Sequence, residues 1–352
     1  MRRISAQCAA ALLLAFLTAG TAPPLPASGA ATTLQPGAPA ALATGPGEVL
    51  YIVDTERDQI LRYLPRTGFQ VFAGDGKRGF SADGTPALRA RLELNWWSGL
   101  AVGGDGAVYF TDGNRVRDVP SSNGALETMA GGGNITLGRP AVPALRANLS
   151  TGGDGLAGLT FGPGGELYIA TGEGVYRLGP DAMLHWVVGE PLPFPPDWGG
   201  VYSNPAVQND FTNAVHLAFD SSGDLFVAGG GGFGLYEKTS KGQLSFVEVL
   251  RAQGGAPGSL ATAPDGTVVA ASGTWGLQWA EPSGRLRLVR ADWPQSSGAH
   301  HVYFCPCFGD GVAVGTKGQI YVDTDHGDAV PNQGLYEVMP SGRVLPLWEA
   351  PD

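Results

Sequence analysis

Short apolar stretches separated by glycine-rich, polar turns recur six times along the chain. Each copy opens with a tetrad of small and apolar residues, at 41–44, 99–102, 158–161, 216–219, 259–262 and 311–314. Ten positions after each tetrad begins, the chain carries Tyr51, Tyr109, Tyr168, Phe226, Val269 and Tyr321. Apolar–polar alternation bounded by Gly, Pro, Asn, Asp and Ser is typical of β-strands. The two positions therefore predict the first and second strands of a repeated unit.

Each copy continues with two more strands. The third strands are expected at 60–63, 116–119, 175–178, 235–238, 277–280 and 335–338. A turn and an outer strand follow, as where Pro340, Ser341 and Gly342 precede residues 343–345. Self-similarity at this long period indicates a propeller or a solenoid. Since six four-stranded sheets packed radially bury one another's faces, we predict an all-β, six-bladed β-propeller of four-stranded antiparallel blades. The first and last copies each have four strands, so the ring should close without an exchanged strand, although the segment before Ala41 could still add one.

The N-terminus has a different pattern. Arg2 and Arg3 precede an apolar run at residues 9–19, and small residues then lead to Ala30. This layout predicts a secretory signal peptide over residues 1–30 and a single propeller over 31–352. The run is shorter than the ~20 residues of a membrane span. We therefore expect a secreted, extracellular protein with no membrane span.

Composition and charge limit the partners. The chain has 55 Gly in 352 residues, 15% charged residues and a net charge of −10, which becomes −12 without Arg2 and Arg3. The glycines lie at regular turn positions, as a repeat protein requires. Nucleic acid and anionic membranes attract basic surfaces, so this acidic body excludes both as expected partners.

The crossing between the first two copies resembles the linker of the NHL-repeat family. Residues 73–76 read Ala-Gly-Asp-Gly, 79–87 contain a second glycine-rich run that ends Thr-Pro-Ala, and 88–92 read Leu-Arg-Ala-Arg-Leu. The family usually has glycine where this chain has Ala82 and Thr85. A second crossing keeps Pro-Ala-Leu-Arg-Ala-Asn-Leu at 143–149, and Asp54 and Asp112 match the family's Tyr-x-x-Asp step. The resemblance spans residues 40–350 and implies the propeller fold.

The same resemblance leaves function open. Members of such propeller families bind protein or RNA on one rim, sense ligands outside bacterial cells, or use a metal at the channel mouth for lyase or lactonase chemistry. One fold hosts many functions, so individual residues must decide between them.

His216 is the leading catalytic candidate. The other five tetrads begin with Ala, Gly, Gly, Ser and Gly, whereas this one begins with histidine, which should lie near the central channel. Asp210 and Asn213 precede it and would extend a polar cluster at the channel mouth. The imidazole could bind a metal or act as a general base. Alternatively, it fills a gap between blades and donates a hydrogen bond to a backbone carbonyl.

Two other clusters carry candidate chemistry. Cys305 and Cys307 are expected to form a disulfide in an oxidising compartment; inert thiols, or a soft metal held with His300 and His301, are the alternatives. Asp323 and Asp325 alternate in a loop and could offer oxygen ligands to calcium, although the full calcium-loop pattern is absent and a solvated turn is the default. We expect no cofactor, with Ca²⁺ or Zn²⁺ at these clusters as the alternative.

Aromatic residues concentrate in the crossings. Trp97, Trp198 and Trp275 lie near strand ends, where aromatic rings suit contacts with peptide or carbohydrate and equally suit packing between blades. Three functions follow for the chain: a secreted module that binds a protein, peptide or glycan; a metal-assisted lyase or lactonase with its site near His216; and a structural role in the cell envelope. The first is preferred, because no Gly-x-Ser-x-Gly, His-Glu-x-x-His or phosphate-loop motif is present.

Overall fold

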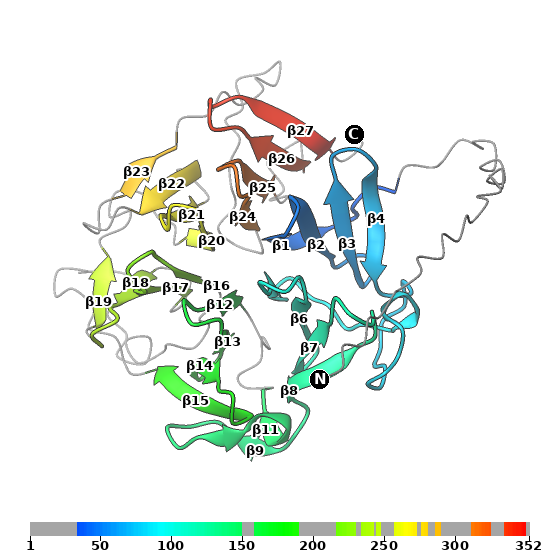
Figure 1. Cartoon of the computed structure of the whole chain (residues 1–352), viewed down its shortest axis with the longest axis vertical. Coiled ribbons are helices and arrows are strands. Elements are labelled where there is room, and N and C mark those ends of the chain that lie inside the picture. The colour runs from blue at the N-terminus through cyan, green and yellow to red at the C-terminus, as the bar shows by residue number, and fades with distance from the viewer. Residues whose placement is uncertain are drawn as a thin grey trace, which may run out of the picture. The chain divides into compact units, whose positions relative to one another are not determined.

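Six antiparallel four-stranded blades are arranged about a central opening (Figure 1). The computed structural model describes residues 34–149, 158–189, 216–229, 234–242, 244–247, 257–272, 276–280, 286–289, 311–324 and 334–349. All of them belong to one compact unit, residues 34–352. The predicted fold class is therefore confirmed. In the described ranges, no helix is long and apolar enough to cross a membrane.

Each blade is one contiguous stretch of chain whose strands run from the axis outward. The first blade comprises β1 (Pro39–Gly45), β2 (Val49–Asp54), β3 (Gln59–Leu64) and β4 (Gly68–Ala73). The second comprises β5 (Leu100–Val102), β6 (Val108–Asp112), β7 (Arg115–Val119) and β8 (Glu127–Gly131). The third comprises β12 (Leu159–Phe161), β13 (Leu167–Thr171), β14 (Gly174–Leu178) and β15 (Met183–Val188).

The other half of the ring repeats the plan. The fourth blade comprises β16 (His216–Phe219), β17 (Leu225–Gly229), β18 (Gly234–Lys238) and β19 (Leu244–Val247). The fifth comprises β20 (Pro257–Thr262), β21 (Val268–Ser272), β22 (Gly276–Ala280) and β23 (Leu286–Leu288). The sixth comprises β24 (Val312–Val314), β25 (Ile320–Thr324), β26 (Gly334–Val338) and β27 (Val344–Glu349).

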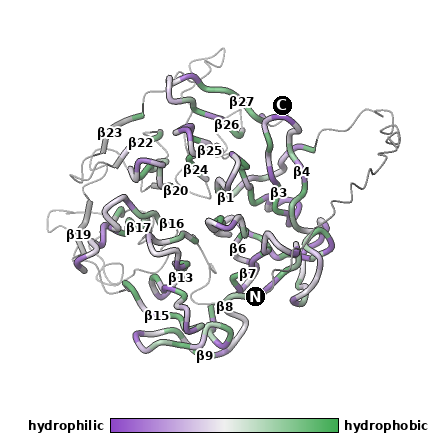
Figure 2. Tube along the Cα trace, viewed as in Figure 1, coloured by the Kyte–Doolittle hydropathy of each residue, from purple (hydrophilic) through white to green (hydrophobic). Residues whose placement is uncertain are grey.

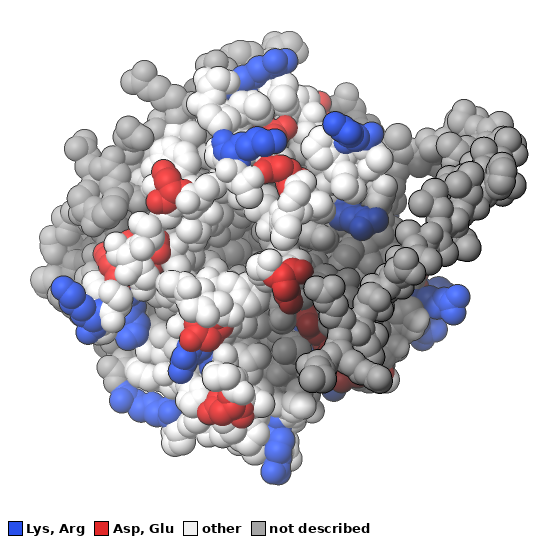
Figure 3. Space-filling view, viewed as in Figure 1, with Lys and Arg blue, Asp and Glu red and all other residues white. Residues whose placement is uncertain are grey.

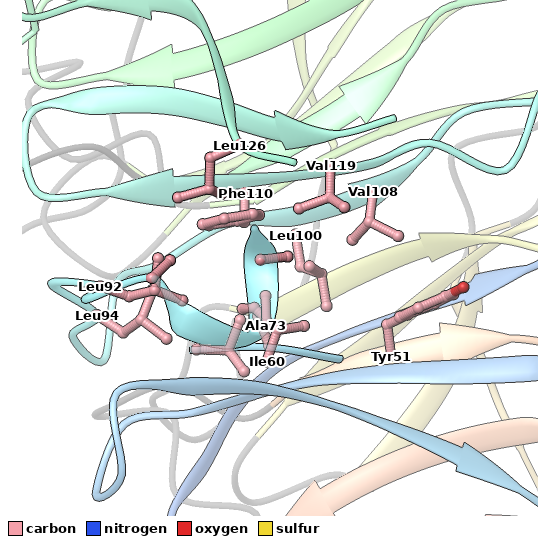
Figure 4. Close-up of a cluster of buried hydrophobic side chains, with 14 of the residues drawn as sticks. Tyr51, Ile60, Ala73, Leu92, Leu94, Leu100, Val108, Phe110, Val119 and Leu126 are labelled. Carbon is pink, nitrogen blue, oxygen red and sulfur yellow. The ribbon is translucent and has the colours of Figure 1, made fainter. Parts of the chain in front are cut away.

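The hydrophobic core is divided among the junctions between blades. Among the described residues, each of the six junctions has its own cluster of buried side chains. At the first junction, Tyr51 and Ile60 from one blade meet Leu100 and Phe110 from the next (Figure 4). Figure 2 shows hydrophobic residues along the strands and hydrophilic residues at many of the turns. Burial at the junctions is what fixes the ring, because no single sheet covers both of its faces.

The ring closes through side chains at the junction of the first and sixth blades. The Thr44 hydroxyl donates a hydrogen bond of 2.7 Å to the Val314 carbonyl oxygen. Glu48 accepts hydrogen bonds from Thr316 and Gln319. Because β1–β4 and β24–β27 form complete sheets of their own, the expectation of closure without an exchanged strand holds.

The crossings after the first and second blades cover the outer edge of the next blade. Residues of the first crossing bond to the segment just before β8, where the Leu126 amide donates to the Thr85 carbonyl. In the second crossing, β10 (Val142–Pro143) pairs with β15, and β9 (Ile135–Thr136) pairs with β11 (Ala147–Asn148). The 3-10 turns η1 (Ala87–Arg89) and η2 (Ala144–Arg146) follow the covering segments. Both edges are therefore protected from further strand pairing.

Candidate functional site

The central channel has a narrow end and a wide end. Six residues at the second tetrad position, one from each blade, line both parts: Leu42, Leu100, Leu159, Leu217, Leu260 and Val312. Residues at the first tetrad position line the narrow end, and residues at the third and fourth positions line the wide end. The repeat thus places the first tetrad position at the narrow end, the third and fourth positions at the wide end, and the second position between them.

The narrow end encloses a cavity of about 40 Å³. His216 lines it together with Trp96 and Trp97, which precede the second blade, and with Ser98 and Ser259. An Asn-centred turn holds the two tryptophans, because the Asn95 side-chain oxygen accepts a hydrogen bond of 2.8 Å from the Trp97 amide. The structure therefore brings together two residues singled out from the sequence, His216 and Trp97, from blades two places apart in the ring.

The His216 imidazole is partly buried, and none of the described residues hydrogen-bonds it. Burial lowers the pKa of His216 to about 4, so the ring is neutral at pH 7. At the equivalent position, a Cβ added to Gly311 would lie 2.8 Å from the Leu42 side chain, which shows how tightly the blades approach here. A large residue fits only where a neighbouring blade leaves room, as at His216.

The described side chains that line the narrow cavity do not supply enough ligand atoms for a metal site. Ser98 and Ser259 hydroxyl oxygens already accept hydrogen bonds, from the amides of Asn95 and Val312. Within the part of the chain that the structure describes, no three His, Cys, Asp or Glu side chains are grouped to hold a metal ion. A single imidazole beside two engaged hydroxyls does not fit a divalent cation, which takes four or more ligands.

The wide end opens into a funnel, the name used below for the cavity of about 530 Å³ on the side of the turns between first and second strands. Apolar side chains dominate its lining, and Phe161 and Phe219 add aromatic surface. Each ring packs edge-on against a tyrosine, with centroid separations of 5.1 Å to Tyr109 and 4.7 Å to Tyr168. These contacts fix the two rings before any ligand arrives.

Four polar side chains of the funnel can act only as hydrogen-bond acceptors when the two carboxylates are ionised. Thr44 and Thr262 already donate their hydroxyl protons to the carbonyls of neighbouring blades, each at 2.7 Å. Asp220 and Asp265 line one wall, at the turns of the fourth and fifth blades. In the face seen in Figure 3, acidic side chains stand at several places around the central hollow.

Asp323, a predicted calcium ligand, is a buried residue of β25, and its role as a ligand stays a prediction. It is 2% exposed, and its Oδ1 accepts a hydrogen bond from the Gly311 amide. Thr111 makes the equivalent contact with the Gly99 amide in the second blade. The other predicted site residues lie outside the described residues: Asp210, Asn213, Trp198, Trp275, His300, His301, Asp325, Cys305 and Cys307. Their roles stay predictions.

Two buried aspartates at strand ends anchor the chain where it enters a blade. Asp54 is fully buried and accepts hydrogen bonds from the Gly37 and Ala38 amides. Asp112 accepts one of 2.6 Å from the Glu93 amide. Both carboxylates therefore serve the fold, in agreement with their position at strand ends.

Comparison with known proteins supports the fold and leaves the family open. No family model matches the chain, so the NHL-repeat likeness stays a resemblance. The chain is 26% identical to mouse (Mus musculus) teneurin-3 over 204 residues, which is 53% of this chain but only 7% of teneurin-3.

Solved structures of other propellers superpose over most of the chain. A streptogramin B lyase gives a TM-score of 0.53 at 13% identity, covering 89% of this chain and 84% of that one. A protein described as a gluconolactonase gives 0.53 at 12% identity, covering 87% and 90%. At these identities the likeness shows the fold alone.

Proposed function

We propose that the chain is a secreted binding module that takes a group of its extracellular ligand, a protein, peptide or glycan, into the funnel. The observation that carries the proposal is the funnel itself. Its volume of about 530 Å³ lies within the ~300–1,000 Å³ range of ligand pockets. An apolar lining with a few fixed polar groups is the usual composition of such pockets.

Rigidity favours binding at this place. The funnel is built from inner strands, which are the most enclosed part of each blade, and its two phenylalanines are held by tyrosines. A pre-formed pocket loses little conformational entropy when a ligand enters, so even a modest contact area produces measurable affinity.

The test is a screen of peptide and glycan arrays with three proteins. Thr160 lines the funnel and is partly exposed, so Thr160→Trp should fill the cavity. Ser121, on an exposed turn of the second blade, gives the matched control Ser121→Trp. Ligands of the funnel are lost by Thr160→Trp and retained by Ser121→Trp. Array hits that survive Thr160→Trp would place recognition elsewhere and refute the proposal.

A second function, lyase or lactonase catalysis near His216, is favoured by one observation. The neutral imidazole lines the narrow cavity beside Trp97, where it could accept a proton. The described residues offer no metal-ligand set, so metal assistance would require residues outside the described ranges. Metal content of the purified protein before and after His216→Ala decides this. A stoichiometric metal that disappears in the variant would favour the enzyme, whereas equal metal content in both proteins would count against it.

A further inference from the structure

We infer that the funnel selects a ligand with an apolar body and a cationic, donor-rich head, an ammonium or guanidinium group. The inference rests on the proposed function and specifies the chemistry of its ligand. It depends on the polar groups of the funnel, which offer lone pairs and negative charge beside apolar side chains.

The two acidic side chains of the funnel are held in place by their own turns. Asp220 Oδ1 accepts hydrogen bonds from the Ser222 and Asp224 amides, at 2.9 and 2.8 Å. Asp265 Oδ1 accepts one from the Thr267 amide at 2.9 Å. In the described part of the chain, Oδ2 of each carboxylate has no hydrogen-bond partner. Each therefore presents a fixed carboxylate with one oxygen available.

The two turns form one wall. The Ser221 amide donates a hydrogen bond of 3.1 Å to the Gly266 carbonyl, which joins the turns of the fourth and fifth blades directly. A Cβ on Gly266 would lie 2.2 Å from the Ser221 Cβ, so the turns are in close contact. Asp220 and Asp265 are thus held on adjacent positions of the same wall, and a single cation can face both.

Within the described lining of the funnel, no positive charge offsets this wall. Asp220 and Asp265 are the charged residues of its described lining, which includes no Lys or Arg. Asp224 and Glu237 lie behind the wall, and burial together with Asp224 and Asp220 raises the pKa of Glu237. Negative charge is therefore concentrated on this side, which attracts cations and repels anionic ligands.

Two hydroxyl groups of the funnel, one on the first blade and one beside Asp265, strengthen the same preference. Thr44 and Thr262 have donated their protons within the protein and can only accept from a ligand. An ammonium group carries three donors and a guanidinium five, so either satisfies several acceptors at once. The apolar remainder of the ligand would lie against Phe161, Phe219 and the six residues shared by both ends of the channel.

Three probes of similar size and different charge test the inference: 2-phenylethylamine, 2-phenylethanol and 3-phenylpropionate. Their dissociation constants for the full chain are measured by ligand-observed NMR at low salt. We expect the amine to bind most tightly and the carboxylate most weakly. Asp220→Asn with Asp265→Asn should weaken amine binding by about five- to twentyfold, the effect of removing two partly exposed charge-assisted contacts, and should leave the alcohol unchanged.

Asp105→Asn is the matched control. Asp105 occupies the turn position of Asp265 in the second blade and likewise accepts from an amide two residues on, the Ala107 amide, but it does not line the funnel. It should leave amine binding unchanged. Equal affinity for all three probes, abolished by Thr160→Trp, would refute the cationic preference and leave the proposed function standing. No binding by any probe, or binding that Thr160→Trp leaves unaffected, would overturn both.

A comparison with peptides distinguishes two sources of the cationic group, a peptide side chain and a small amine. N-acetyl-Phe-Lys-amide is compared with 2-phenylethylamine, and N-acetyl-Phe-norleucine-amide serves as its uncharged control. Tighter binding of the lysine peptide than of the amine would assign the head group to a peptide side chain. The reverse order would assign it to a small amine, and a norleucine peptide equal to the lysine peptide would contradict the inference.

Discussion

Arg117, in the third strand of the second blade, offers the sharpest test of how this propeller holds its crossings. The side chain is fully buried, yet it is ionic. Its guanidinium donates to the Ser81 carbonyl at 3.0 Å and pairs with Asp83 at 3.1 Å and with Asp112 at 3.4 Å. One residue thus joins the crossing that follows the first blade to the sheet of the second. The guanidinium also lies 5.5 Å from the centre of the exposed Phe80 ring.

Replacing Arg117 by Met keeps the length of the side chain and removes its charge. Asp112, which is only 4% exposed, would then be left as a buried carboxylate without its cation. Removing one partner of a buried pair costs about 3–5 kcal/mol. Asp83 is 57% exposed and contributes little, and Asp112 keeps the Glu93 amide, so we expect about 3 kcal/mol for Arg117→Met.

Urea unfolding followed by circular dichroism measures this loss. Arg115→Met is the control on the same strand, because Arg115 is partly exposed and bonds to the neighbouring Asn114 side chain at 2.8 Å. It should cost less than about 1 kcal/mol. A double-mutant cycle with Asp112→Asn should return a coupling energy of about 1–3 kcal/mol. An Arg117→Met variant as stable as Arg115→Met, or a coupling energy near zero, would refute the assignment.

Three further predictions concern ring closure and pH. Thr44→Val removes the hydrogen bond to Val314 and should lower the free energy of unfolding by about 1 kcal/mol in urea melts. Thr262→Val, which removes the equivalent bond between the fourth and fifth blades, is its control. A much smaller loss for Thr44→Val than for Thr262→Val would mean that the Thr44 bond does not hold the ring closed. Burial raises the pKa of Asp118 to about 6, so between about pH 4 and pH 6 the folded state binds a proton that the unfolded state does not, and stability falls as pH rises through that window. Asp118→Asn should raise the free energy of unfolding by roughly 1–2 kcal/mol above pH 6 and leave it unchanged below pH 4. An equal effect at both pH values would contradict the assignment. The lowered pKa of His216 has the opposite effect, because the unfolded chain takes up a proton near pH 6.5 and the folded chain only near pH 4. The free energy of unfolding should therefore fall as pH is lowered from 6.5 to 4, and His216→Gln should remove this fall. An imidazole NMR titration with a midpoint near 6.5 would disprove the burial argument.

Sequence periodicity was sufficient to predict the fold because each position must match its equivalents in the other blades and must also pair with a position of the adjacent strand. The tetrad at 41–44 and Tyr51 have equivalents in every blade, and these pair as adjacent strands, as Ala43 does with Tyr51 and Ala101 with Tyr109. A register error of one residue would turn every apolar side chain away from its junction. The same logic located His216 among small residues at the start of its strand.

The funnel could not be predicted in the same way. Asp220 and Asp265 lie in sequences that read simply as turns, Asp-Ser-Ser-Gly-Asp and Pro-Asp-Gly, and only the convergence of the hairpins places them on one wall. Arg117 was equally inconspicuous, because an arginine in a strand usually faces solvent. Two of its partners, Ser81 and Asp83, come from a crossing 34–36 residues earlier in the chain. Short-range patterns carry no information about such pairs.

The self-contained blades have a consequence for how the chain can be rearranged. Since each blade is drawn from one uninterrupted stretch, the polypeptide could be cut between β4 and β5 and rejoined at the first–sixth seam without dividing a sheet. Propellers in which one blade combines strands from both chain termini lack this freedom. Circular permutants opened within 75–98 should therefore retain the native set of strand pairings. An engineered chain with one blade duplicated would strain the closure of the ring rather than the blade itself.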